Sequence, residues 1–295
     1  MRWRTERRST NIEDRRSSGI SMGRSSGIPG GKATGIGGLG LILVLVLAVA
    51  MGVDPGQIIG GTDYTSDSSG YQSQLTSVQQ DELADNVALV LGDTETTWAT
   101  IFEDQLGKTY REPKLVLYTG YVDSACGQAS AAVGPFYCPA DEKVYLDLDF
   151  FYALQQEYHA PGDFAQAYVI SHEIGHHVQN LLGTIEYVDR KTRSLSEADA
   201  NELSVALELQ ADCYAGVWAK QAMYNDLILE SGDLEEAMNA ASAVGDDTLQ
   251  MQYQGYVVPD SFTHGSSAQR VSWFKRGMDA GLVSDCNCPG LPVVG

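Results

Sequence analysis

His172-Glu173-Ile174-Gly175-His176-His177 is the stretch on which the other predictions depend. It lies inside residues 163–183, where Asp163 can cap the start of a helix, Gly183 can end it, and no proline interrupts. Large apolar residues recur through this span at helical spacing, namely Phe164, Tyr168, Val169, Ile170, Ile174, Val178, Leu181 and Leu182. The span therefore predicts a helix on which His172 and His176 face the same way.

Two imidazoles on one helix face can supply two of the protein ligands of a tetrahedral Zn²⁺ ion. Glu173, next to the first histidine, can take a proton from a water bound to that ion. This arrangement is the H-E-x-x-H motif of zinc hydrolases. The alternative is a polar helix face with two solvated histidines. The mostly apolar surroundings weaken that alternative, because histidine and glutamate are costly to bury unless something binds them.

Residues 196–220 predict a second helix, because Ser196 can cap it and apolar residues recur at spacings of three or four: Leu203, Leu207, Ala211, Tyr214 and Trp218. Glu208 and Asp212 share one face of this helix. A zinc site that keeps one position open needs three protein ligands, so we predict that Glu208 is the third. Asp212 can then accept a hydrogen bond from the outer nitrogen of a histidine ligand. In isolation, such an acidic pair would indicate an exposed helix face. Downstream of an H-E-x-x-H motif, it indicates a site for one Zn²⁺ ion per chain.

Several stretches together resemble the bacterial neutral zinc metallopeptidase family, the YpfJ-like proteins. They are Gly134-Pro135-Phe136-Tyr137-Cys138-Pro139-Ala140-Asp141, Lys143-Val144-Tyr145-Leu146-Asp147, Asp163-Phe164-Ala165-Gln166-Ala167-Tyr168, His264-Gly265-Ser266-Ser267-Ala268-Gln269-Arg270 and the N-terminal Met1-Arg2-Trp3-Arg4. The resemblance covers most of the chain and implies a membrane-anchored zinc protease. It also implies that residues 144–147 form an edge strand that can pair with an extended peptide. The alternative is a core strand with both edges occupied.

The charge of the chain divides into two opposite regions. The whole sequence has 19 basic and 39 acidic residues, a net charge of −20. Residues 1–35 carry eight basic and three acidic side chains, so the excess of acid lies entirely in the remainder. Phosphate binding needs a basic surface, which disfavours nucleic acid as a partner of the acidic part. A basic arm of residues 1–35 is better explained by contact with anionic lipid.

Residues 36–53 are uncharged and mostly aliphatic, and they supply about the 20 residues that a bilayer requires. They predict one transmembrane helix. Arginines precede it and acids follow it, so we expect a single-pass protein of the cell membrane with a cytoplasmic N-terminus and an extracytoplasmic catalytic domain. A cleaved signal peptide and a buried core helix are the alternatives. Residues 54–78 then form a flexible linker, and residues 79–295 the metallopeptidase domain.

The domain is predicted to be α+β and zincin-like, mainly helical with a small sheet. Residues 81–91 and 95–106 predict two helices, and residues 114–118 and 143–148 predict strands. Cys126 and Cys138 flank the loop between these strands and are candidates for a disulfide outside the cytoplasm. Cys213 is predicted to be a packed thiol, with a bridge to Cys286 or Cys288 as the alternative.

His264 is a second catalytic candidate. In zinc proteases, a histidine or tyrosine opposite the catalytic glutamate donates a hydrogen bond to the oxyanion of the reaction. The Thr263-His264 to Arg270 spacing is also similar to that of the membrane proteases that include the CAAX-processing enzymes, although Gly265 stands where those enzymes carry proline. This similarity implies a supporting role for Arg270. The alternatives are a capping or surface His264, and an Arg270 that simply pairs with an acid.

Together, these patterns predict a membrane-anchored zinc metalloendopeptidase that hydrolyses peptide or protein substrates through a zinc-activated water. The proposed ligand set leaves one metal position open and adds a base, which a structural zinc site does not need. The alternative is a catalytically inactive zinc-binding interaction or assembly module of the cell envelope.

Overall fold

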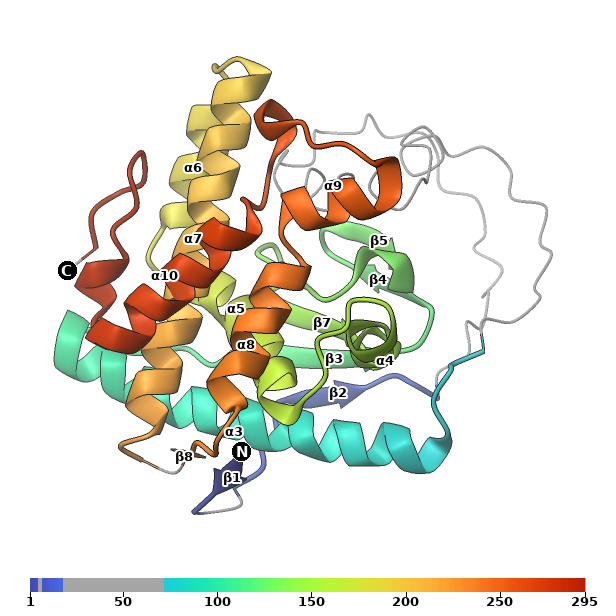
Figure 1. Cartoon of the computed structure of the whole chain (residues 1–295). Helices are drawn as coiled ribbons and strands as arrows, with labels where there is room; N and C mark the ends of the chain where they lie inside the picture. The colour runs from blue at the N-terminus through green and yellow to red at the C-terminus, as the bar shows by residue number, and fades with distance from the viewer. Residues whose placement is uncertain (5–6, 18–71, 226, 295) are drawn as a thin grey trace, which may run out of the picture.

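The computed structural model describes residues 1–4, 7–17, 72–225 and 227–294, which form a mainly helical domain with small sheets (Figure 1). The helices are α3 (Ser77–Leu106), α4 (Asp149–Gln156), α5 (Asp163–Leu181), α6 (Thr184–Thr192), α7 (Glu197–Ala222), α8 (Asp233–Ala243), α9 (Asp246–Gln254) and α10 (Ser267–Ala280). Short 3₁₀ helices lie at η1 (Ala131–Val133), η2 (Pro259–Ser261) and η3 (Val283–Cys286). The predicted transmembrane helix at residues 36–53 and most of the predicted linker lie outside the described residues.

Helices α5, α7 and α10 meet at glycines. A Cβ added to Gly175 of α5 would lie 2.9 Å from the carbonyl oxygen of Ala211 in α7. At the crossing of α7 and α10, a Cβ on Gly277 would lie only 1.9 Å from the carbonyl oxygen of Cys213. Backbones can approach this closely only where a side chain is missing. The glycine inside the H-E-x-x-H stretch therefore lets the second helix lie directly against the first.

The four-stranded sheet has the order β2-β3-β7-β6, with β2 at Ile12–Asp14, β3 at Lys114–Tyr118, β7 at Lys143–Asp147 and β6 at Phe136–Cys138. β2, β3 and β7 are parallel, whereas β6 is antiparallel to β7. The predicted edge position of residues 144–147 is therefore wrong, because β3 and β6 occupy both edges of β7. The edge strands are β2 and β6, and β6 is the one beside β7. Its three residues are too few for an alternating pattern to mark it as a strand.

Two further pairs of strands complete the sheet structure. β4 (Tyr121–Ser124) and β5 (Gly127–Ser130) form an antiparallel hairpin. β1 (Arg2–Trp3) pairs with β8 (Leu227–Ile228). Residues 1–4 and 7–17 are thus part of the domain and do not form a separate arm. Their arginines pair with acids of the domain, as Arg7 does with Glu95 and Arg16 with Asp81.

Helix α3 is continuous where two helices were predicted. Asp93 and Thr94 lie in the predicted gap between the two, and both are buried and hydrogen-bonded inside the helix bundle. Asp93 accepts a hydrogen bond from the indole nitrogen of Trp218 at 2.7 Å. The helix also begins earlier than the predicted domain boundary, because Thr76 and Gln79 form a capping box. Across the parts of the chain that the structure describes, no helix is both long and apolar enough to cross a bilayer.

The predicted disulfide between Cys126 and Cys138 is present and ties the β4–β5 hairpin to β6. Cys213 is not a packed thiol, because it forms a second disulfide with Cys286. This bond joins α7 to the C-terminal segment, two parts of the chain that are 73 residues apart. Cys288 is a buried free thiol.

Candidate metal centre

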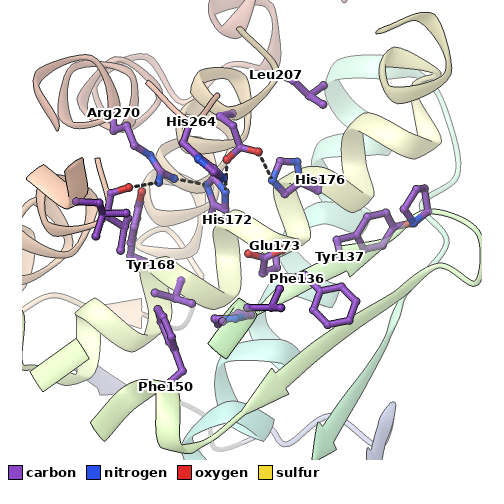
Figure 2. Close-up of a pocket in the computed structure, with 18 of the residues that line it drawn as sticks. Phe136, Tyr137, Phe150, Tyr168, His172, Glu173, His176, Leu207, His264 and Arg270 are labelled. Atoms are coloured by element: carbon purple, nitrogen blue, oxygen red, sulfur yellow. Dashed lines mark hydrogen bonds and ion pairs between the residues drawn. The ribbon is translucent and has the colours of Figure 1, made fainter. Parts of the chain in front are cut away.

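The two histidines of α5 and one glutamate of α7 form a buried cluster (Figure 2). His172 Nε2 lies 3.2 Å from one carboxylate oxygen of Glu208, and His176 Nε2 lies 3.4 Å from the other. One ligand atom from each residue lies within 4.8 Å of the others. The helical spacing places the imidazoles on one face of α5, and the contact at Gly175 brings Glu208 opposite them. The structure thus gathers all three predicted zinc ligands.

Asp212 orients the ring of His172, as the spacing of α7 predicts. His172 Nδ1 donates to Asp212 Oδ1 at 2.8 Å, and Tyr168 donates its hydroxyl to the same oxygen at 2.5 Å. The guanidinium of Arg270 donates to both oxygens of Asp212, at 2.9 and 3.0 Å. Burial disfavours the Asp212 carboxylate, but Arg270 and His172 outweigh burial and lower its pKa. Arg270 does pair with an acid, and that acid is the one that orients a predicted ligand.

Gln179 holds the second histidine. His176 Nδ1 donates to Gln179 Oε1 at 2.9 Å, and the Gln179 amide donates to the Leu207 carbonyl oxygen at 2.7 Å. Sequence reasoning missed both Gln179 and Tyr168. Their spacing from the histidines on α5 is compatible with a contact, but a glutamine or a tyrosine on a helix carries no signal of its own.

The donor set fits a zinc ion. With both Nδ1 atoms donating outward, each histidine keeps the lone pair of its Nε2 for the side that faces Glu208. Two imidazole nitrogens and a carboxylate are the ligands of the His₂Glu class of catalytic zinc sites. The three residues line a cavity of about 120 Å³ that Glu173 and His264 also line.

Glu173 is buried beside the cluster, with 8% of its surface exposed. Burial raises the pKa of its carboxyl, against the opposing influence of the two histidines. A carboxylate with a raised pKa is a stronger base than one in water. The predicted base therefore lies where it can exchange protons with a group in the cavity.

His264 belongs to the same site and is neither a surface nor a capping residue. Its Nδ1 lies 3.1 Å from Asp246 Oδ1, while its Nε2 is buried and has no hydrogen-bond partner within the described residues. Asp246 Oδ2 accepts three backbone N–H groups, those of Thr263, His264 and Gly265, at 2.7–2.9 Å. Burial opposes the charged imidazole, but Asp246 outweighs burial and raises the pKa of His264. Asp246 was missed, since it lies 18 residues before His264 at the start of another helix.

His177 points away from the cluster and supports the metal helix. Its Nε2 donates to the Arg111 carbonyl oxygen at 2.6 Å, and Tyr137 donates its hydroxyl to Nδ1 at 2.9 Å. Both ring nitrogens are therefore used by the neutral form. Burial lowers the pKa of His177 to about 4.

This lowered pKa predicts an acid-dependent loss of stability. Between about pH 6.5 and 4, the unfolded chain protonates His177 and the folded chain does not, so the free energy of unfolding falls as the pH falls. The loss amounts to about 3 kcal/mol for 2.5 pKa units. We expect the free energy of unfolding of the metal-free protein, measured with urea, to fall more steeply with decreasing pH over this range than that of His177→Gln. Parallel curves for the two proteins would contradict the assignment.

Comparison with known proteins agrees with this site. A model of the family described as "Putative neutral zinc metallopeptidase" matches residues 1–288. The Escherichia coli K12 protein named "Uncharacterized protein YpfJ" is 50% identical over 293 residues, which cover 99% of this chain and 100% of that protein. The Mycobacterium tuberculosis H37Rv protein named "Uncharacterized protein Rv2575" is 37% identical over 256 residues, which cover 81% of this chain and 84% of that protein. No solved structure matches this chain. The chain therefore belongs to the neutral zinc metallopeptidase family.

Proposed function

We propose that this protein is a zinc-dependent metalloendopeptidase with a zincin-like catalytic domain. The observation that carries the proposal is the incomplete ligand set. Three protein ligands converge, and a buried carboxylate, Glu173, lines the same cavity as they do. Structural zinc sites are closed by four protein ligands and have no use for a base. The inactive zinc-binding module that the sequence left open would not need this arrangement.

Zinc bound by His172, His176 and Glu208 would supply Lewis acidity toward a water molecule and toward the scissile carbonyl group. Glu173 takes the proton from the attacking water and later delivers it to the leaving nitrogen. The free Nε2 of His264 donates a hydrogen bond to the oxyanion that forms on the carbonyl. Asp246 fixes the ring of His264, whereas Asp212 and Gln179 fix the rings of the two ligands.

Metal-dependent cleavage is the direct test. We expect the purified full chain to contain about one zinc per molecule and to cleave a mixture of unstructured proteins. A chelator should stop cleavage, and added zinc should restore it. Bound zinc without any cleavage would instead support the inactive module, and a folded protein without zinc would overturn both readings.

The role of His264 predicts a separable effect. We expect His264→Gln to lower kcat/KM by about 10²–10³-fold, since that is the usual cost of losing one oxyanion donor. Zinc content should stay unchanged, because His264 is not one of the ligands. Mass spectrometry measures the zinc content, and a peptide-hydrolysis assay measures kcat/KM. His159→Asn, at an exposed position outside the site, is the control. Equal activity of the two variants would remove His264 from the mechanism.

We also propose that the domain acts outside the cytoplasm, on peptides or proteins of that compartment. Two disulfides favour this location, since cytoplasmic thiols are kept reduced. The predicted single crossing with a cytoplasmic N-terminus is not part of this proposal, because β1 and β2 of the N-terminal segment pair with strands of the domain.

A further inference from the structure

The cavity beside the metal centre has two chemically different sides (Figure 2). His172, His176, His264 and Arg270 lie on one side of Glu173. The rings of Phe136 and Phe150 lie on the other. The lining of the cavity also includes the apolar residues Val133, Pro135, Val169 and Leu249. A peptide that places its scissile bond at Glu173 must therefore place a neighbouring side chain against the apolar side.

Phe150 is part of this apolar side of the cavity. Gly134 has φ +78°, and a Cβ added to it would lie 3.4 Å from the ring of Phe150. The loop that leads into β6 thus passes close to this ring. Phe150 is only partly buried and lines the cavity. One ring therefore contacts both the loop and the space that a substrate would enter.

Strand β6 offers the matching backbone. One of its edges pairs with β7, and its other edge makes no backbone hydrogen bond to any described residue. Phe136 and Tyr137 of this strand line the cavity. A free strand edge can bind an extended peptide through its unpaired N–H and C=O groups. Backbone pairing and side-chain selection thus come from the same short segment.

We infer that the substrates are extended peptides that pair with the free edge of β6 and place a large apolar side chain against Phe150 and Phe136. This inference rests on the proposed function and names its substrate class. A charged side chain would lose its water at this wall and gain no hydrogen-bond partner there. Phe150 is accordingly a specificity-determining residue.

Cleavage-site mapping on a mixture of denatured proteins tests the preference. We expect Leu, Ile, Phe or Met to be enriched on one side of the cleaved bonds. For paired peptides that differ only by Leu or Asp at that position, Phe150→Ala should reduce the ratio of their kcat/KM values about 10-fold or more. Tyr152→Ala, on the same helix but lining a separate hollow, is the matched control. Cleavage without any side-chain preference, or an unchanged ratio in Phe150→Ala, overturns the inference.

A binding measurement keeps this inference separate from the proposed function. Fluorescence anisotropy of the same peptides with zinc-loaded Glu173→Gln reports recognition without turnover. Tighter binding of the Leu peptide, weakened in the Glu173→Gln/Phe150→Ala double variant, supports the inference even if the wild type cleaves nothing. Equal binding of the Leu and Asp peptides overturns it even if the wild type is an active peptidase.

A second inference comes from residues 7–17, which complete the domain. β2 pairs with β3 from Ile12↔Leu115 to Asp14↔Leu117. Glu95 of α3 is only 1% exposed and accepts hydrogen bonds from Ser9, Asn11 and Arg7. A Cβ on Gly92 would lie 2.7 Å from the Arg7 carbonyl oxygen. Without this segment, α3 would keep a buried carboxylate that had lost three donors.

We infer that residues 7–17 and the domain lie on the same side of any membrane. Paired strands cannot be separated by a bilayer. A single crossing by residues 36–53, with the N-terminus and the domain on opposite faces, is therefore incompatible with the β2–β3 pairing.

Cysteine labelling in intact cells tests this second inference. Thr10→Cys in the N-terminal segment and Thr100→Cys on α3 are both exposed, and the unsubstituted chain measures background labelling of its own cysteines. A membrane-impermeant maleimide should label both positions or protect both until the cells are lysed. Labelling of only one of the two before lysis overturns the inference.

Discussion

Glu173→Gln should lower peptide hydrolysis by about 10²–10⁴-fold, the range that general acid–base catalysis contributes. Glutamine has the same shape as glutamate but cannot accept the proton of the attacking water. Because Glu173 is not among the three ligands, the variant should keep its zinc. Initial rates on a quenched peptide, measured beside zinc content by mass spectrometry, separate catalysis from metal binding.

A matched substitution tests whether the loss of activity comes from general damage to the fold. Glu202→Gln changes an exposed glutamate of α7 in the same way and should leave the rate and zinc content as in the wild type. Thermal unfolding of both variants checks that the domain is intact. If zinc-loaded Glu173→Gln cleaves peptides at the wild-type rate, Glu173 is not the base.

Glu208→Ala should remove most of the zinc. The carboxylate provides the only ligand from α7, and its loss leaves two imidazoles on one helix. Changes to residues that merely orient a ligand weaken metal affinity about 10–100-fold, and we expect loss of the ligand itself to cost more. Metal content after dialysis, together with competition against a chelator, measures the effect.

Two variants of α7 bracket this prediction. Glu202→Ala removes an exposed glutamate and should retain about one zinc per chain. Asp212→Asn leaves the ligands in place but weakens the orientation of His172, so its affinity should fall between those of wild type and Glu208→Ala. Zinc retained by Glu208→Ala at the wild-type level would rule out the predicted ligand set.

Local helix geometry explains why the metal ligands could be predicted. Residues three and four apart on a helix share a face, so His172 and His176 follow from spacing alone, as do Glu208 and Asp212. The apolar pattern also predicted α5 and α7 within a few residues of their observed ends. Each of these predictions depends on one short segment and on no other part of the chain.

Contacts between distant segments account for what the sequence did not reveal. Asp246 reaches His264 from another helix, and Cys213 meets Cys286 only because α7 packs against the C-terminal segment. The same holds for β6, which is an edge strand because it pairs with the outer side of β7. The sequence alone does not show whether a hydrogen-bond acceptor, a thiol or a three-residue strand has a partner nearby in the fold.

The chain's own periodicity thus specified the ligand helices and their chemistry. An α-helix sets side-chain directions through backbone hydrogen bonds between residues four apart, so a short segment is enough. The packed molecule supplied the rest: the residues that orient the ligands, the free edge beside the cavity, and the incorporation of residues 12–14 into the sheet. Those features depend on which surfaces meet when apolar area is buried, and burial is a property of the whole domain, not of any single segment.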